Sequence, residues 1–216
     1  DFLAKPFVEA EFFALLEKTR AAAEAKKRKF RFKAKLYSID ATVIDLCLSM
    51  YEWANFRRAK GAIKLHLRLD HDGYLLTYAV VTEGKRHEAR LARDFQYEPG
   101  SITVIDKGYT DFSLFGHLCG LKACFVTRLK DNASIRTVKK LPVPSGKGVR
   151  SDKIIRWRGF YSIQKCPYPL RKVEYYDHEQ DRVLTFLTNH FTLAASTIAA
   201  IYKDRWAIEN FFKSLK

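Results

Sequence analysis

Residues 202–216 read YKDRWAIENFFKSLK, and this stretch decides the fold. At about 100° per residue in an α-helix, Arg205, Glu209 and Lys216 fall within about 60° of Tyr202. The apolar residues gather on the neighbouring face: Ile201 just before the stretch, then Ile208, Phe211, Phe212 and Leu215. An ordinary amphipathic helix with a solvated face is the simpler interpretation. A large tyrosine gains little from solvent, however, and one acid between two cations is typical of a metal ligand flanked by phosphate contacts.

Two aspartates stand near the ends of predicted strands. Asp40 lies in the strand expected over residues 36–42, and Asp106 directly follows the apolar run of residues 101–105. Such an aspartate alone is more often a turn or cap residue. Together with Glu209, the two supply carboxylate oxygens of the kind that hold two Mg²⁺ ions, one activating the attacking hydroxyl and one stabilising the leaving oxygen of a phosphodiester.

The remaining hydrophobic pattern predicts an α/β fold. Strands are expected over residues 36–42, 63–69 and 74–81, with a turn at 71–73, as an antiparallel meander. A helix at 87–95, a strand at 101–105, a helix at 112–121 and a strand at 123–129 follow. Residues 142–148 read as a loop, and β-type runs occupy 154–163, 172–176 and 182–187. Helical spacing returns from residue 193, so a mixed sheet with flanking helices is expected.

Composition favours a polyanionic partner. The 216 residues carry 39 Lys and Arg against 24 Asp and Glu, a net charge of +15, and are 47% hydrophobic, enough for a genuine core. Residues 26–35 hold seven basic side chains and no acid. This run suits either phosphate contacts or a solvated helix end.

The sequence has no run of about eighteen apolar residues and no zinc or disulfide pattern among its cysteines. These features predict an intracellular protein with reduced thiols and no membrane contact.

A family resemblance joins these motifs. Residues 202–216 match Tyr-x2-Arg-x3-Glu-x6-Lys, the signature of the insertion-sequence-four family of DDE transposases. Residues 38–42 (SIDAT) resemble the family's first-aspartate motif, and residues 104–109 (VIDKGY) resemble its second, with Lys107 in place of arginine. Residues 60–66, 83–87 and 186–191 also look similar to the family. The resemblance thus covers about residues 35–216, and three ordered motifs together are highly specific.

The resemblance implies a ribonuclease H-like fold and a domain plan. Residues 1–35 would form a lead-in helix and basic linker, 36–129 the first part of the core, 130–191 a β-rich insertion, and 192–216 the catalytic helix. Asp40, Asp106 and Glu209 would be both the catalytic residues and the ligands of two Mg²⁺ ions, for which Mn²⁺ can substitute. Tyr202, Arg205 and Lys216 would contact DNA phosphates.

The implied activity is cut-and-paste transposition, in which DNA strands are hydrolysed at the element ends and the freed 3′ hydroxyls are joined to target DNA. Implied partners are double-stranded DNA and a second copy of the chain, as a homodimer in the DNA complex, in the bacterial cytoplasm with nucleoid association when DNA-bound. The insertion should supply an aromatic residue that stacks on a flipped base, and Trp157 is the tryptophan found there. The chain begins at Asp1 and ends at the last signature residue, so the activity of this piece alone stays open.

Alternatives remain at several positions. A structure-selective nuclease or resolvase of the same fold would share the carboxylates, and a DNA-binding relic would bind no metal. His66 and His87 favour scaffold roles over chemistry. Asp70 and Asp72 fit a hairpin turn beside Gly73 better than a metal site. A basic and aromatic group could line DNA or belong to a solvated loop: Trp53, Arg57, Arg58 and Lys60.

Overall fold

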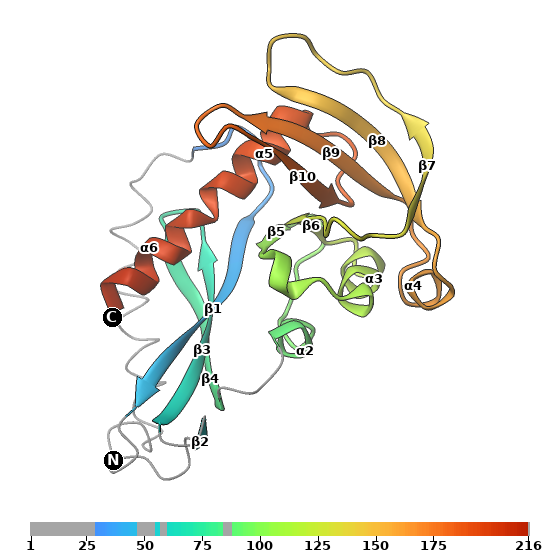
Figure 1. Ribbon diagram of the computed structural model, residues 1–216. Helices are drawn as coiled ribbons and strands as arrows, with labels where there is room; N and C mark the ends of the chain where they lie inside the picture. The colour runs from blue at the N-terminus through green and yellow to red at the C-terminus, as the bar shows by residue number, and fades with distance from the viewer. Residues whose placement is uncertain (1–28, 47–54, 57–59, 84–87, 216) are drawn as a thin grey trace.

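The computed structural model describes residues 29–46, 55–56, 60–83 and 88–215 (Figure 1). It is a mixed α/β structure built on one large mixed sheet, as the sequence predicts. The strands are β1 (Leu36–Leu46), β2 (Asn55–Phe56), β3 (Lys60–Asp70), β4 (Leu75–Glu83), β5 (Ile102–Ile105), β6 (Cys124–Arg128), β7 (Ile135–Lys140), β8 (Val149–Trp157), β9 (Leu170–Asp177) and β10 (Arg182–Thr188). The helices are α2 (Glu88–Ala92), the 3₁₀ helix η1 (Lys107–Tyr109), α3 (Phe112–Gly120), α4 (Phe160–Lys165), α5 (Ala195–Asp204) and α6 (Trp206–Leu215).

The centre of the sheet is parallel. Strand β1 pairs with β5 in parallel register, from Leu36↔Ile102 to Ile39↔Ile105, and β5 pairs in parallel with β6. All four residues of β5 are buried, which agrees with its β-branched sequence of two Ile, one Val and one Thr. On the other side of β1, β3 and then β4 add as antiparallel strands. The expected meander and the expected strand, helix and strand over residues 101–129 are therefore present.

The second half of the chain extends the same sheet. Strand β10 pairs antiparallel with β6, and β9, β8 and β7 follow in order. Two details of the prediction for this region were wrong. Strand β7 was missed because its residues are mostly exposed and show no alternation of apolar and polar side chains. The predicted β run over 154–163 ends at Trp157, because Gly159 begins helix α4, whose first turn is closed by a bond from Ser162 Oγ to the Gly159 carbonyl.

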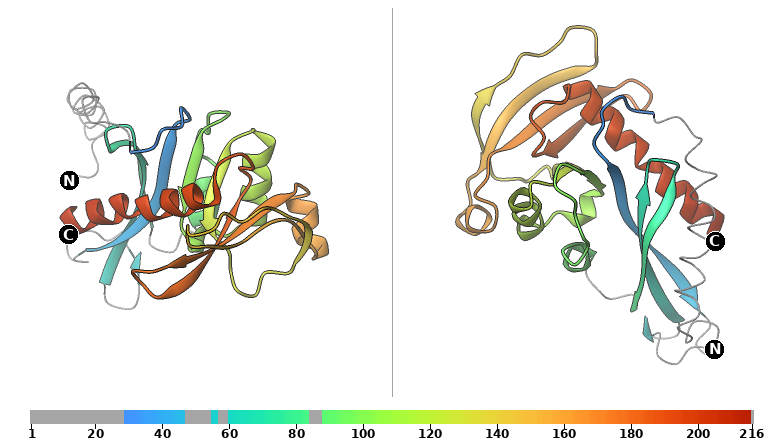
Figure 2. Two further views of the ribbon diagram at one scale, coloured as in Figure 1. Left: turned by 90° about the horizontal axis from the view of Figure 1, so that it is seen from above. Right: turned by 180° about the vertical axis from the view of Figure 1, so that it is seen from behind.

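Two apolar cores cover the two faces of the sheet. Neighbouring residues of one strand alternate between them, so that Phe125 joins the core under α3 and Val126 joins the core under α5. Figures 1 and 2 show α2, α3 and α4 on one side and the α5–α6 rod on the other. A third, small cluster packs Ile208 and Phe212 of α6 against Leu67 and Leu69 of β3. Among the described helices, none is both long and apolar enough to cross a membrane.

The last helix is interrupted. Continuous helical spacing predicted one helix from residue 193, but α5 ends at Asp204 and α6 begins at Trp206, with Arg205 between them. Here the backbone makes bonds three residues apart, from Arg205 N to Tyr202 O (3.2 Å) and from Ile208 N to Arg205 O (3.1 Å). Such a local 3₁₀ step inside a helix often marks a functional position.

Candidate active site

Asp40 lies in the middle of a strand. The sequence placed it where a strand runs out, but β1 continues to Leu46 because its second half pairs with β3. Asp40 itself stands opposite Leu67, and its Oδ1 accepts a bond of 2.8 Å from the Ala41 backbone N–H. Its side chain is only 16% exposed, so this carboxylate is held away from bulk water on the face toward Arg205.

Asp106 follows β5 and caps the short helix η1. Its Oδ2 accepts from the Gly108 N–H at 3.3 Å, as expected for an N-cap aspartate. Its Oδ1 accepts from the Tyr202 hydroxyl at 3.2 Å. Asp106 therefore has two roles in the fold: it begins η1, and through Tyr202 it meets α5 just before Arg205.

One guanidinium group touches all three predicted carboxylates. Arg205 Nη1 donates to Asp40 Oδ2 at 2.7 Å, and Arg205 Nη2 donates to Glu209 Oε1 at 2.5 Å. The same Nη2 lies 3.6 Å from Asp106 Oδ1. Asp106 and Glu209 are 41% and 37% exposed, whereas the Arg205 side chain is 7% exposed. The three acids therefore surround a buried cation.

Burial and charge separate the acidities of the two aspartates. Burial raises the pKa of Asp40 to about 6, since the opposing attraction of Arg205 is reinforced only by one backbone bond, and Asp106 and Glu209 add repulsion. Burial also acts upward on the pKa of Asp106. There, Arg205, the backbone N–H groups of Gly108 and Lys107 and the Tyr202 hydroxyl together outweigh burial, and the pKa of Asp106 lies below its usual range.

Tyr202 is a buried member of the site. Its ring packs into the core under α5, and the Arg205 guanidinium carbon lies 5.4 Å from the ring centroid. Burial, followed by the nearby Asp106 charge, raises the pKa of the Tyr202 hydroxyl to about 12, so this group donates to Asp106 as a neutral phenol. Tyr202 and Arg205, which were predicted to contact DNA phosphates, both contact carboxylates in this structure.

A cavity of about 440 Å³ opens beside the carboxylates, and Asp106, Arg205 and Glu209 form part of its wall. The cavity is also lined by the ends of β9 and β10 and by α5, through residues such as Asp177, Arg182 and Lys203. In the part of the chain that the structure describes, no three acidic, histidine or cysteine side chains are arranged to enclose a metal ion as they stand. The guanidinium occupies the centre of the acidic group.

Other candidates from the sequence fall elsewhere. Trp157 is 3% exposed and packs edge-on against Phe112, so the suggestion that it stacks on a DNA base was wrong. Side chains alternate between the two faces of β8, and Trp157 lies on the same buried face as Ile155, so it points into the core. His66 is buried with Nε2 3.0 Å from Thr82 Oγ1, in keeping with a scaffold role. Asp70 Oδ1 accepts from the Asp72 N–H in the predicted turn.

Several predicted residues lie outside what the structure describes. These are Lys216, His87, Trp53, Arg57, Arg58 and the part of the lead-in segment before residue 29. The side chain of Lys60 also lies outside the description. Sequence reasoning also missed two buried polar neighbours of the site. His71 and Asp204 were not singled out, although the polar Asp204 directly precedes Arg205 in the decisive stretch, and a buried polar residue in a helix is a signal to seek its partner.

Fold and site together define a mixed α/β protein with three acidic side chains gathered on one buried arginine beside an open cavity. Comparison with known proteins then gives the family. The chain belongs to the family described as "Transposase DDE domain", whose family model matches residues 31–216.

Two curated relatives agree with this membership. "Putative transposase y4zB" of Sinorhizobium fredii is 31% identical over 213 residues, which is 97% of this chain and 58% of that protein. "Probable transposase for insertion sequence element IS5377" of Geobacillus stearothermophilus is 26% identical over 193 residues, 88% of this chain and 50% of the relative. The chain therefore spans about half the length of these relatives. A solved endonuclease V from Bacillus subtilis aligns over 96% of this chain and 94% of its own, at 10% identity and a TM-score of 0.34.

Proposed function

We propose that this chain is the catalytic part of a cut-and-paste transposase of the insertion-sequence-four type, acting by phosphodiester hydrolysis and strand transfer. Asp40, Asp106 and Glu209 are its catalytic carboxylates. The observation that carries the proposal is the single guanidinium of Arg205 in contact with all three. These acids come from a central strand, a strand end and a helix, and lie 66 and then 103 positions apart in the chain.

The donor set fits divalent cations. Carboxylate oxygens are the ligands that Mg²⁺ and Mn²⁺ prefer, and Asp106 and Glu209 already border the cavity. Burial raises the pKa of Asp40 to about 6 despite the attraction of Arg205, so a cation held beside this carboxylate would favour its ionised form. We propose that Asp40, Asp106 and Glu209 would hold two Mg²⁺ ions, which supply an activated hydroxyl and charge neutralisation at the leaving oxygen.

The contacts of Arg205 with the three carboxylates also suggest a role for Arg205 and Tyr202. Divalent cations held by these carboxylates would neutralise them and would weaken the attraction that keeps the guanidinium there. Because Arg205 borders the cavity, its side chain is then close enough to pair with a phosphate, for which a guanidinium is well suited. Tyr202, next to it, and Lys216, the last residue of the signature, complete the proposed phosphate contacts.

The arrangement of strands supports a ribonuclease H-like core. Three antiparallel strands, β4, β3 and β1, are followed in the sheet by β5 and β6, which are parallel to β1 and joined by α3. In the proposed domain plan, residues 36–129 and 192–216 form this core and residues 130–191 form an insertion between the second aspartate and the glutamate. Strands β7 to β10 and α4 belong to that insertion.

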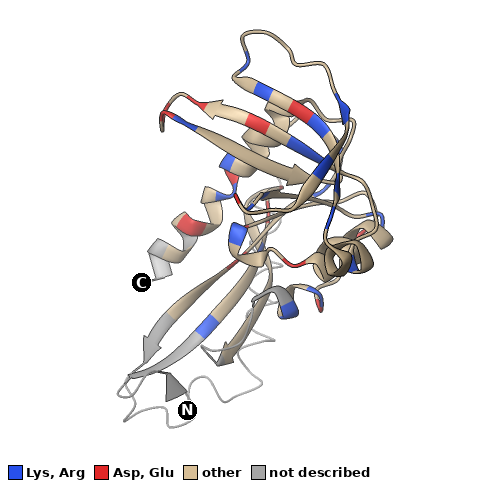
Figure 3. Ribbon diagram, turned by 45° about the vertical axis from the view of Figure 1, so that its right-hand side comes forward, with Lys and Arg blue, Asp and Glu red and all other residues tan. Residues whose placement is uncertain are grey.

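Double-stranded DNA is the proposed substrate, and a lysine row in the proposed insertion supports it. Lys140 of β7 pairs directly with Lys153 of β8, which pairs directly with Lys172 of β9. Figure 3 shows basic segments side by side on these strands. Directly opposed like charges destabilise a sheet, and a phosphate backbone lying across them removes the repulsion. Lys172 pairs with Glu174 at 2.7 Å, and the charge of Lys153 also acts on the Glu174 carboxylate. The family resemblance further implies a homodimer on DNA.

Metal binding by the three carboxylates tests the catalytic assignment. Mn²⁺ binding is measured by calorimetry for the wild type and for Asp40→Asn, Asp106→Asn and Glu209→Gln, each checked for folding by circular dichroism. We expect the wild type to bind and each variant to lose most of the affinity. A folded wild type without Mn²⁺ binding would refute the metal-dependent activity and favour a DNA-binding relic.

Strand transfer separates transposase from resolvase. The intact parent protein is given a duplex with a free 3′ hydroxyl and a supercoiled plasmid, and in parallel a branched DNA, each with Mg²⁺. Joined product that depends on the three carboxylates is the expected result. Cleavage of the branched DNA without any joining would contradict the proposal and favour a structure-selective nuclease.

The lysine row has its own test. Affinity for a short duplex is measured against salt concentration for the wild type, for Lys140→Gln/Lys153→Gln, and for Lys122→Gln/Lys165→Gln as a control of equal charge. If both row lysines contact phosphates, the salt slope of the first variant falls by about 1.8, at about 0.9 per phosphate contact. Equal slopes in the two double variants would exclude the row as a DNA contact.

A further inference from the structure

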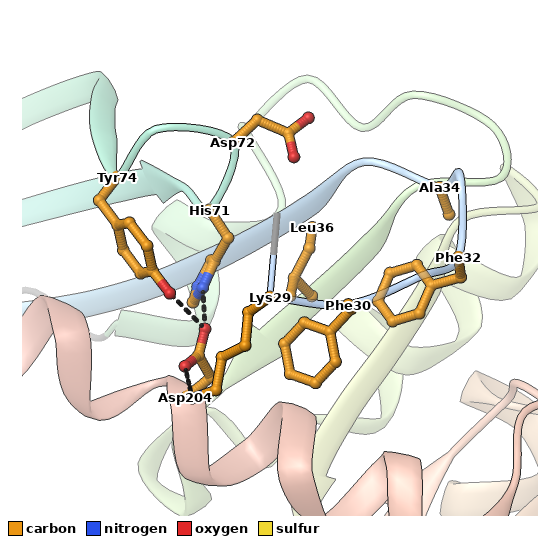
Figure 4. Close-up of a pocket in the computed structure, with 9 residues that line it drawn as sticks. All are labelled: Lys29, Phe30, Phe32, Ala34, Leu36, His71, Asp72, Tyr74 and Asp204. Atoms are coloured by element: carbon orange, nitrogen blue, oxygen red, sulfur yellow. Dashed lines mark hydrogen bonds and ion pairs between the residues drawn. The ribbon is translucent and has the colours of Figure 1, made fainter. Parts of the chain in front are cut away.

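A buried network of hydrogen bonds lies near the three carboxylates. Asp204 Oδ2 accepts from His71 Nδ1 at 2.7 Å, and His71 Nε2 lies 2.7 Å from Ser38 Oγ. The Tyr74 hydroxyl donates to the same Asp204 oxygen at 3.2 Å, and Lys29 pairs with the other. Figure 4 shows Tyr74, His71 and Lys29 converging on the Asp204 carboxylate from three directions. This hydrogen-bond network links the last residue of α5 to strand β1 through the turn after β3.

The order serine, histidine and aspartate is that of a hydrolase triad, but this one has no access to substrate. Ser38 is 0% exposed and lies inside the central strand β1, and His71 is 6% exposed. A nucleophile needs a reacting atom within about 3 Å, which these positions exclude. The arrangement instead satisfies every member of a buried polar group, which makes it rigid.

The hydrogen-bond network lies next to the three carboxylates in the sequence. Asp204 directly precedes Arg205, and Ser38 is two residues before Asp40 on β1. At about 100° per residue, Asp204 points about 200° away from Tyr202, so the end of α5 is held from opposite sides. His71 is fixed in its turn by its own backbone, because its N–H donates to the Leu36 carbonyl at 2.9 Å.

The Asp204 carboxylate is held as an anion. Burial raises its pKa, but the bonds from His71 and Lys29 outweigh burial, and the pKa of Asp204 lies below its usual range. An ionised, multiply bonded side chain next to the helix interruption resists both rotation and sliding of α5.

We propose that Asp204 and His71 are positioning residues, which clamp the end of α5 to β1 and the turn after β3 and thereby aim Arg205 and Glu209 at Asp40. This inference rests on the proposed function, because it assigns a purpose to the geometry of the three carboxylates. The clamp is the Asp204–His71 bond, and the Ser38 bond to His71 is secondary to it.

Two variants of His71 separate these bonds. The amide nitrogen of asparagine lies near the position of Nδ1, so His71→Asn keeps a donor for Asp204. The amide nitrogen of glutamine reaches the position of Nε2, so His71→Gln keeps the Ser38 contact and loses the clamp. Asp204→Asn is the third variant. Asp152→Asn is the matched control, because Asp152 is also a buried acid, paired with Arg171 at 2.6 Å in the β-rich half.

The first measurement needs no metal. Arg205 Nε is buried, so its N–H should give a resolved side-chain NMR signal, identified by its loss in Arg205→Lys. We expect this signal to persist in His71→Asn and Asp152→Asn, and to broaden or disappear in His71→Gln and Asp204→Asn. An unchanged signal in folded His71→Gln and Asp204→Asn would overturn the inference. If Asp204→Asn does not fold, the two His71 variants decide.

The second measurement is Mn²⁺ affinity by calorimetry. Residues that orient metal ligands typically change affinity by about 10- to 100-fold, and we expect a loss in that range for His71→Gln and Asp204→Asn only. A purely structural role would lower the unfolding midpoint of all four variants and leave Mn²⁺ affinity within about twofold. If the Arg205 signal is lost in His71→Gln and Asp204→Asn as expected but the wild type binds no Mn²⁺, the proposed metal function fails while the clamp stands.

Discussion

Asp40→Asn should stabilise the metal-free protein above pH 6. Burial raises the pKa of Asp40 from its ordinary 3.8 to about 6. Ionising this group therefore costs more free energy in the folded protein than in the unfolded chain. Asparagine keeps the shape of the neutral carboxyl and never ionises. The substitution therefore removes an electrostatic strain that serves the proposed site and not the fold.

The magnitude follows from linkage. Between pH 3.8 and about 6 the folded state keeps a proton that the unfolded state has lost, so wild-type stability falls as pH rises through this window and stays low above it. At about 1.4 kcal/mol per pH unit, the unfolding free energy of the wild type falls by about 3 kcal/mol across this window. The Asp40 side chain is only 16% exposed, so solvent screening reduces this figure little.

Urea unfolding in the presence of EDTA, at half-unit steps from pH 4 to pH 8, measures the effect. The unfolding free energies of wild type and Asp40→Asn should nearly coincide at pH 4 and diverge to about 3 kcal/mol in favour of the variant above pH 6. An Asp40→Asn protein that is less stable than wild type at pH 8 would show that Arg205 more than compensates the buried charge, and would refute the reasoning.

Asp106→Asn serves as the internal contrast. Its folded-state pKa is depressed, so ionised Asp106 stabilises the fold at neutral pH, and this contribution is lost as pH falls through its folded-state pKa. We therefore expect Asp106→Asn to be less stable than wild type at pH 7, opposite in sign to Asp40→Asn. The same sign for both would mean that the two aspartates share one environment.

Three further changes test the packing and the site. Tyr202→Phe removes the hydroxyl bond to Asp106 and should lower the unfolding free energy by about 1 kcal/mol in urea. Gly116→Ala places a Cβ 2.0 Å from the Lys165 carbonyl oxygen, so α3 and α4 must separate, at about 1–3 kcal/mol by the same assay, whereas Gly120→Ala meets only an ordinary contact and should not destabilise in this way. Mn²⁺ at about 100 times its dissociation constant should add about 2.7 kcal/mol to wild-type stability and EDTA should remove it, with no such gain in Asp106→Asn.

Much of the fold could be predicted because local signals agreed with the global structure. Residues 102–105 (ITVI) are all β-branched and three of them are apolar, and the structure buries all four inside a parallel centre. Prediction was wrong where tertiary context decided. Phe160 and Ile163 favour strands by intrinsic preference, yet they belong to α4 because Gly159 ends the extended stretch. The expected strand end at Asp40 was wrong because pairing with β3 carries β1 on to Leu46.

The proposed site divides in the same way. Helical spacing correctly grouped Tyr202, Arg205 and Glu209 near one another, since that relation depends on residues within one stretch of chain. It could not show that α5 ends at Asp204, because the interruption is held by His71, which is 133 positions away and whose role depends on the folded turn. Contacts between distant segments have no periodicity in the sequence to reveal them.

The placement of Arg205 explains how an acidic site can exist in the protein before any cation arrives. Two aspartates and a glutamate brought together without compensation would repel one another and favour an opened site. A buried guanidinium with five donors offers one charge to all three, and leaves the pKa of Asp40 raised, so compensation is incomplete. In the proposed site, a divalent ion held by Asp40, Asp106 and Glu209 would supply twice the charge that Arg205 offers them. Arg205 would then be available to pair with a phosphate, so that one side chain would couple cation binding to substrate contact.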